Sequence, residues 1–186
     1  MQRAHGFTIV ELLIVIVVIG ILAAISIVAY GNISQKANNA ATIDVAGKTL
    51  KLIQAYVAEN GTYPLTGPAT QVACVTTQSG CRDSTGAIAA HAVFDGNMSS
   101  VGQLPRSVPI QNSERYGIHI TYWSGATEGP VYMIYTLKGI STQCGLSGVL
   151  NSSMNGYATG GYTNGNLNGL GMTMCAIKVP GPAHSA

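Results

Sequence analysis

The stretch Gly6-Phe-Thr-Ile-Val-Glu-Leu-Leu-Ile-Val-Ile-Val-Val-Ile-Gly-Ile-Leu-Ala-Ala-Ile-Ser-Ile-Val-Ala-Tyr30 determines how the rest of the chain is interpreted. Its single charged residue is Glu11. As a helix, residues 7–30 would extend about 36 Å, which exceeds the roughly 30 Å hydrocarbon core of a bilayer. Because a backbone in lipid must satisfy its own hydrogen bonds, the run predicts one transmembrane helix.

A cleavable secretory signal is the first alternative for this stretch. Such signals combine a basic start, an apolar region of about 7–15 residues and a small-residue cleavage site. Arg3 and His5 supply a basic start and Ala23–Ala24 are small, but the apolar run is too long and no clear site follows it. The same basic residues predict a cytoplasmic N-terminus, which places residues 31–186 outside the membrane.

Glu11 needs an explanation because a carboxylate deep in lipid costs about 2.5–3.5 kcal/mol on insertion scales. In one interpretation it lies at the membrane surface, where the helix dipole favours a negative charge. In the other it pairs with an amine. A cut after Gly6 would give Phe7 a free α-amine, mostly protonated at pH 7. That amine could belong to the same chain or to a neighbour, and the spacing does not choose between them.

The segment from Gly6 to Leu13, with the aliphatic run through Ala24, resembles the N-terminal signature of type IV pilins and pseudopilins. The resemblance extends to Glu59-Asn-Gly-Thr-Tyr-Pro64 and so covers about residues 1–63. It implies that a prepilin peptidase cuts after Gly6 and that the new N-terminal residue, Phe7, is N-methylated. It also implies that Glu11 pairs with a neighbouring subunit's N-terminus during assembly.

One position departs from the family pattern. Many pilins have a proline near the end of the apolar run, where this chain has Val28. That proline helps to loosen the helix in the filament, so the resemblance gives no expectation that the helix melts here. Gly20 is retained and is a candidate weak point.

The expected fold class is α+β, with a long N-terminal helix packed on a small antiparallel sheet. We divide the chain into a leader at 1–6, a transmembrane helix at 7–30, an amphipathic continuation at 31–61 and an extracellular head at 62–186. The helix should end near Ala58, because Asn60-Gly61 and Pro64 follow. A stripe at helical spacing should pack on the sheet: Ile43, Ala46, Leu50, Ile53 and Val57.

The head shows clear strand patterns only in its second half. Alternation over 116–123 and a β-rich run over 131–137 predict an antiparallel hairpin around a turn at 124–130. Residues 172–179 form a third candidate strand. Residues 65–115 are poorly patterned, and 145–171 are rich in Gly and Asn and predict a loop.

Four cysteines at positions 74, 81, 144 and 175 allow three disulfide pairings. We favour the sequential pairing, Cys74–Cys81 and Cys144–Cys175, because it closes a small loop and staples the Gly/Asn-rich segment between two β regions. A disulfide-bounded C-terminal loop also resembles the D-region of many type IV pilins. Without a Cys-x-x-Cys pair, zinc or thioredoxin-like chemistry is not expected.

Neither an enzyme nor a nucleic-acid-binding protein is indicated. Charged residues make up 9% of the chain and the formal net charge is +2. A nucleic-acid-binding protein would be expected to carry a strongly basic patch instead. No Gly-x-Ser-x-Gly, His-Glu-x-x-His or phosphate-binding motif is present, so we predict no catalytic residue, cofactor or metal. His119 falls on a predicted strand, where a solvent-facing or hydrogen-bonded role is expected.

The leading hypothesis is a type IV pilus subunit, which waits in the membrane and then polymerises through its N-terminal helix into a surface filament. Gly20 and Ala24 form a small-xxx-small pair that would permit close helix approach. The implied partners are other copies of the chain, the prepilin peptidase, the assembly platform and the membrane; a surface ligand is not identified. Alternatives are a pseudopilin of a secretion or DNA-uptake system and a minor pilin or anchored adhesin. Adhesion, motility and DNA uptake all use this N-terminus.

Overall fold

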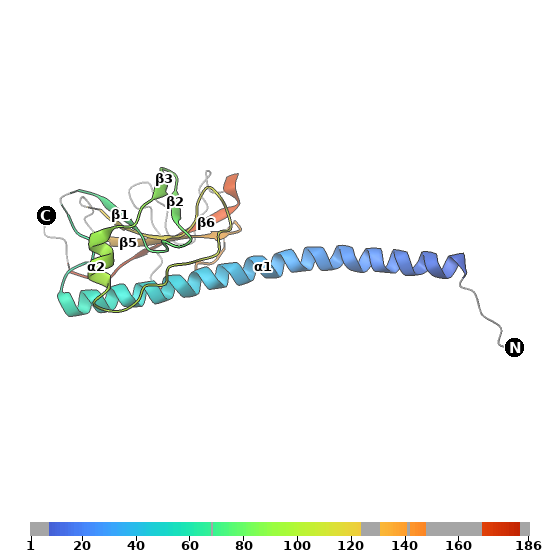
Figure 1. Ribbon diagram of the computed structural model, residues 1–186, viewed down its shortest axis with the longest axis horizontal. Helices are drawn as coiled ribbons and strands as arrows, with labels where there is room; N and C mark the ends of the chain where they lie inside the picture. The colour runs from blue at the N-terminus through green and yellow to red at the C-terminus, as the bar shows by residue number, and fades with distance from the viewer. Residues whose placement is uncertain (1–7, 68, 124–130, 141, 148–168, 183–186) are drawn as a thin grey trace. The chain divides into compact units, whose positions relative to one another are not determined.

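A computed structural model describes residues 8–67, 69–123, 131–140, 142–147 and 169–182 of the chain. The chain divides into two units, Met1–Ala37 and Asn38–Ala186. Figure 1 shows the elements, whose bounds are α1 Ile9–Asn60, β1 Gln71–Cys74, β2 Cys81–Asp83, β3 Gly86–Ile88, α2 Ala92–Met98, β4 Ile118–Tyr122, β5 Val131–Lys138 and β6 Met172–Lys178. A long N-terminal helix followed by a small antiparallel sheet confirms the expected α+β, pilin-like fold.

The helix α1 is a single α-helix of 52 residues. No proline interrupts it, and Val28 lies within it without a break. It ends at Asn60, two residues later than predicted, because Gly61 adopts φ +65° and its N–H bonds the Val57 carbonyl at 2.9 Å. A left-handed glycine directly after the last helical residue is the common way to end a helix.

The buried seam of α1 differs from the predicted apolar stripe. Of the predicted positions Ala46 and Ile53 are buried, while Ile43, Leu50 and Val57 are only partly buried and flank the core. The full seam recurs at spacings of three and four and is half polar: Asn39, Thr42, Ala46, Thr49, Ile53 and Tyr56. The face that docks is therefore rotated from the most apolar one, toward positions where small or hydrogen-bonding side chains permit close approach.

The main sheet has the strand order β1-β4-β5-β6, and all neighbouring strands are antiparallel. The hairpin β4–β5 and the strand β6 match the predicted strands to within a few residues. One row crosses the whole sheet on its inner face, where Ala73, Ile120, Met133 and Ile177 are paired in register and buried. This row lies in one core with Ala46 and Ile53 of α1, so the helix and sheet share a single apolar interior.

The region 65–115 contains elements that the sequence did not predict. The strand β1 completes the main sheet, β2 and β3 form a separate two-stranded sheet, and α2 contributes Phe94 and Met98 to the buried residues. Each of these elements is three to seven residues long. Segments this short give too few repeats for a periodic pattern to be recognised.

A polar contact from Asn39 joins α1 to the end of β5. The Asn39 Nδ2 donates to the Lys138 carbonyl at 2.9 Å, and Oδ1 accepts from the Lys138 backbone N–H at 3.0 Å. The Gln111 side chain also donates to Asn39 Oδ1 at 3.0 Å. The Asn39 amide thus pairs with a strand residue as a neighbouring peptide group would, which explains why a polar residue occupies the buried seam.

Two buried threonines of α1 give a matched test of this packing. Thr49 is fully buried and its Oγ1 has no hydrogen-bond partner, whereas the equally buried Thr42 donates to the Asn38 carbonyl at 3.0 Å. Because a buried unpaired hydroxyl is penalised, we expect Thr49→Val to raise the free energy of unfolding by about 1 kcal/mol. Thr42→Val should give no gain, since it removes a made bond.

The measurement is urea unfolding of the full-length chain in detergent, followed by the fluorescence of its one tryptophan, Trp123. Equal effects of the two substitutions would show that the hydrogen-bonding difference between the threonines does not change the free energy of unfolding.

Candidate functional site

Thr8 and Glu11 form a reciprocal hydrogen-bonded pair at the start of α1. The Glu11 Oε2 accepts from the Thr8 backbone N–H at 2.8 Å and from the Thr8 hydroxyl at 2.7 Å. In return the Thr8 Oγ1 accepts from the Glu11 N–H at 3.2 Å. This is a capping box, in which an N-cap threonine and a glutamate three residues later satisfy each other's backbone donors.

The capping role of Glu11 was missing from the sequence interpretation. The Thr-x-x-Glu spacing before an apolar run was the signal that would have revealed it. Both hydrogen bonds from Thr8 go to the same carboxylate oxygen, Oε2, and no partner is found for Oε1 among the described residues. Half of the carboxylate therefore has no partner within the described chain.

Beyond Glu11, the unit Met1–Ala37 consists of an apolar helical surface without a covering layer. Every large aliphatic side chain from Ile9 to Val28 is 48% to 82% exposed, and Tyr30 and Ile33 extend the surface. Within the described residues, α1 is long and apolar enough to cross a membrane, judged by length and composition. A surface of this size is not stable in water, so lipid or other protein must cover it.

Gly20 has no packing role among the described residues of the chain. A Cβ added at Gly20 would meet no atom within 4 Å. Glycine inside a helix costs about 0.5–1 kcal/mol relative to alanine, so its presence here is not explained by the monomer's own stability. Gly6 and Phe7, the predicted cleavage and methylation positions, lie outside the described residues.

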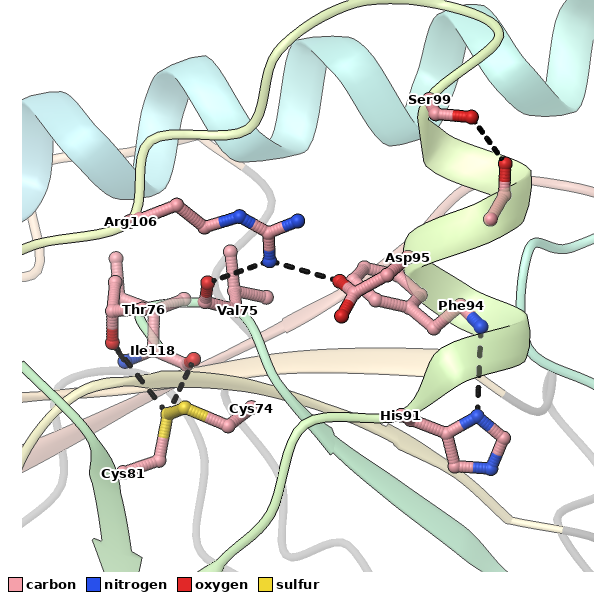
Figure 2. A network of polar contacts seen from close by, with 11 residues as sticks. Cys74, Val75, Thr76, Cys81, His91, Phe94, Asp95, Ser99, Arg106 and Ile118 are labelled. Carbon is pink, nitrogen blue, oxygen red and sulfur yellow. Dashed lines mark hydrogen bonds and ion pairs between the residues drawn. A yellow bond between two sulfur atoms is a disulfide. The ribbon is translucent and has the colours of Figure 1, made fainter. Parts of the chain in front are cut away.

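In the unit Asn38–Ala186, a network of polar contacts orders the region that the sequence left unpatterned (Figure 2). The Arg106 Nη1 donates to Asp95 Oδ1 at 2.9 Å and to the Val75 carbonyl at 3.1 Å, which ties the segment after α2 to α2 and to the end of β1. His91 caps α2, since its Nδ1 accepts from the Phe94 N–H at 3.5 Å.

The disulfide Cys74–Cys81 closes a tight loop beside this network. Inside the loop the Thr76 hydroxyl accepts from the Ile118 N–H at 3.0 Å and donates to the Gly80 carbonyl at 3.3 Å. The Cys81 Sγ lies 3.1 Å from the Ile118 carbonyl oxygen, as Figure 2 shows, but a disulfide sulfur has no hydrogen to donate. Covalent and polar links together hold the loop on β4.

A second disulfide, Cys144–Cys175, joins the segment after β5 to the middle of β6. Of the three pairings that four cysteines allow, the structure thus has the sequential one. The buried Tyr135 donates its hydroxyl to the Cys144 carbonyl at 2.7 Å, and burial raises the pKa of Tyr135 above its ordinary value. Most of the predicted loop that this disulfide encloses, residues 148–168, lies outside the described part of the chain.

His119 is placed differently from the expectation. It was predicted to face solvent or to be hydrogen-bonded, but it is 6% exposed and its Nδ1 has no partner. The cause is the outer face of the sheet, where the register sets His119 between Cys74 and Ile134, both buried. Burial lowers the pKa of His119 to about 4, a shift that Asp83 opposes and Arg115 reinforces.

Within the described residues, no group of three or more His, Cys, Asp and Glu side chains is arranged to hold a metal ion. The features with a functional character are the apolar surface of α1 and the half-paired carboxylate at its start.

Comparison with known proteins bears on the N-terminal region. The family model for the prokaryotic N-terminal methylation motif matches residues 1–27. The fimbrial protein EcpC of Eikenella corrodens is 35% identical over 72 residues, which are 39% of this chain and 47% of that protein. The match therefore spans about half of that relative's length. No solved structure matches the chain significantly. The motif and the fimbrial relative support the expected type IV pilin.

The buried His119 makes the stability of the head depend on pH. Its pKa is about 4 in the folded protein and close to its ordinary 6.5 in the unfolded chain. Between these values the unfolded state binds a proton that the folded state does not, so stability is full above pH 6.5 and falls as the pH falls toward 4. At about 1.36 kcal/mol per pH unit, the loss across this window is about 3 kcal/mol.

Urea unfolding between pH 4 and pH 7 measures this loss. His119→Leu should remove its share of the pH dependence, while His91→Asn, which keeps an N-cap acceptor, should retain it. An unchanged slope in His119→Leu would assign the pH dependence to other groups.

Proposed function

We propose that this chain is the structural subunit of a type IV pilus, polymerised through its N-terminal helix into a surface filament. The observation that carries the proposal is the uncovered apolar surface from Ile9 to Ile33, which begins beside a single carboxylate. A pilus subunit is what the methylation motif and the fimbrial relative support. The processing, the polymerisation and the partners described below are parts of the proposal.

Maturation prepares the N-terminus for assembly. A prepilin peptidase removes residues 1–6 by cutting between Gly6 and Phe7, and Phe7 is then N-methylated. Before assembly the chain crosses the membrane once, with its N-terminus in the cytoplasm and the unit after Ala37 outside, as the basic Arg3 favours. The assembly platform then transfers the subunit from the membrane to the base of the filament.

The same apolar surface has two environments in succession. In the membrane lipid covers it, and in the filament the helices of other copies replace the lipid. Helices associate in such an environment through close packing, which small residues permit. Gly20 and Ala24 lie one helical turn apart, and nothing in the chain's own packing requires a glycine at position 20. We assign both to contacts between copies.

Glu11 controls the register of this packing. The capping box with Thr8 satisfies Oε2, which lowers the cost of keeping the carboxylate near the apolar surface. The free Oε1 can accept a charged donor, and the methylated amine of a neighbour's Phe7 is the donor that maturation creates. A charge buried without its partner costs about 3–5 kcal/mol, so a subunit out of register is excluded.

A pseudopilin is the nearest alternative, and a minor pilin or anchored adhesin is the next. We favour a pilin because the disulfide Cys144–Cys175 closes the C-terminal region, whereas some major pseudopilins have a calcium-binding loop there. Mass spectrometry of sheared surface material decides between them, since a major pilin should dominate the filaments. The same spectrum reports cleavage after Gly6 and methylation of Phe7.

Two substitutions of Glu11 separate its charge from its capping role. Glu11→Gln keeps a capping-box side chain but removes the charge, while Glu11→Leu removes both. We expect both variants to enter the membrane at normal levels. The yield of sheared filaments should fall by at least about tenfold, because the amine of the neighbour is left unpaired.

Immunoblots of membrane and sheared fractions measure the two pools. Normal filament yield from Glu11→Gln, with loss only in Glu11→Leu, would show that Glu11 serves as a helix cap and not as a charge partner.

A further inference from the structure

A groove on the head lies between α1 and the end of β6. It has a volume of about 330 Å³ and lies entirely within the unit Asn38–Ala186. Its apolar lining includes Leu50 from α1 and Ile177 from β6. The cationic Lys51 lines it from α1; Lys178 of β6 also lines it, but its side chain alternates with that of Ile177 and so lies toward the other face of the sheet.

These two lysines have no counter-charge. Within the described residues, Lys48 pairs with Asp44 at 2.7 Å and Arg106 pairs with Asp95 at 2.9 Å. Neither Lys51, which is exposed, nor Lys178, which is partly buried, has a carboxylate within ion-pair distance there. The groove therefore combines apolar walls with the unpaired positive charge of Lys51, a setting that fits a carboxylate on a short aliphatic stem.

The chain carries matching negative charges that are also unpaired. Glu59, in the last turn of α1, and Glu114, in the segment before β4, are both exposed. In the described part of the chain neither takes part in an ion pair. Each copy thus offers an unpaired basic groove and unpaired acids, and a filament places identical surfaces of this kind next to one another.

We propose that the groove receives the Glu59 side chain of a neighbouring copy, which ion-pairs with Lys51. This inference rests on the proposed function. Glu59 lies eight residues after Lys51 on the same helix, so it is about 12 Å further along the axis and about 80° around it. If two copies pack with parallel helices and one is shifted by that distance along the axis, Glu59 of one copy is level with Lys51 of the other. The rotation of about 80° means that the two residues use different sides of the helix.

Such a contact is heterologous, because one copy supplies the acid and the next supplies the groove. It repeats along a filament without closing, as assembly through the helices also does. It links the heads, whereas the Glu11 contact links the helices, so the two can be tested separately.

Charge reversal with a charge swap tests the pairing in the full-length protein. Lys51→Glu and Glu59→Lys should each lower the yield of sheared filaments by about two- to fivefold and make the remaining filaments dissociate at lower salt. The double variant Lys51→Glu with Glu59→Lys should recover the wild-type yield. Lys48→Glu is the matched control, since it reverses a charge one turn away that already pairs within the chain.

Three results would overturn the proposal. They are wild-type yield from both single reversals, failure of the swap to restore assembly, and restoration when Lys51→Glu is combined with Glu114→Lys instead. An intact Cys144–Cys175 bond, checked by non-reducing peptide mapping, shows that a variant head has folded. If wild-type filaments form and Glu11→Gln abolishes them while the lysine variants assemble normally, this inference fails and the proposed function stands. Absence of filaments from the wild-type chain would overturn both.

Discussion

The structure depends on one constraint, which is that water cannot be the solvent of the first half of α1. Large aliphatic side chains from Ile9 to Val28 are about half exposed or more, and none of the residues described in that unit covers them. Burying such side chains is worth about 1.5–3 kcal/mol each, so the unsatisfied driving force is far larger than the stability of a typical domain. Its length and composition fit a bilayer as the covering, and in the proposed filament a bundle of like helices takes the place of the lipid.

The second half of the same helix is covered by its own chain. From Asn39 onward, α1 docks on a sheet of its own chain, and half of the positions in the docking seam are polar. Asn39 pairs with the β5 backbone and Ile53 fills the core, so the seam is specified by hydrogen bonds as well as by burial. One continuous helix thus has a non-specific apolar half and a specific half. In the proposed assembly the first half exchanges lipid for other helices while the second stays docked on the sheet.

The sequence predicted what long patterns encode and missed what short contacts decide. The apolar run, the hairpin β4–β5 and β6 were visible because their patterns extend over many residues. The seam of α1 was misplaced because hydrophobicity alone pointed to Leu50, whereas the Asn39 amide and the small Thr49 permit the closer approach. The burial of His119 was missed because alternation marks the two faces of a strand but does not reveal that both are covered. The capping box was also missed, although the spacing of Thr8 and Glu11 was a sufficient signal for it.

Because the chain has few charged residues, each charge at an apolar surface has a larger influence on how the surface can pack. Charged residues make up 9% of the chain, and three of the six described acids have a partner within it: Asp44 has Lys48, Asp95 has Arg106, and Asp83 accepts from Thr85. Glu11 is only half satisfied, by one oxygen. In a protein with many surface charges an unpaired group carries no information, since solvent and salt screen it. In this chain a charge at an apolar surface or beside a groove is exceptional, and it discriminates between packings because a wrong neighbour leaves it desolvated and unpaired. In the proposed filament, apolar area therefore supplies the driving force for association, and a few carboxylates and ammonium groups determine the register.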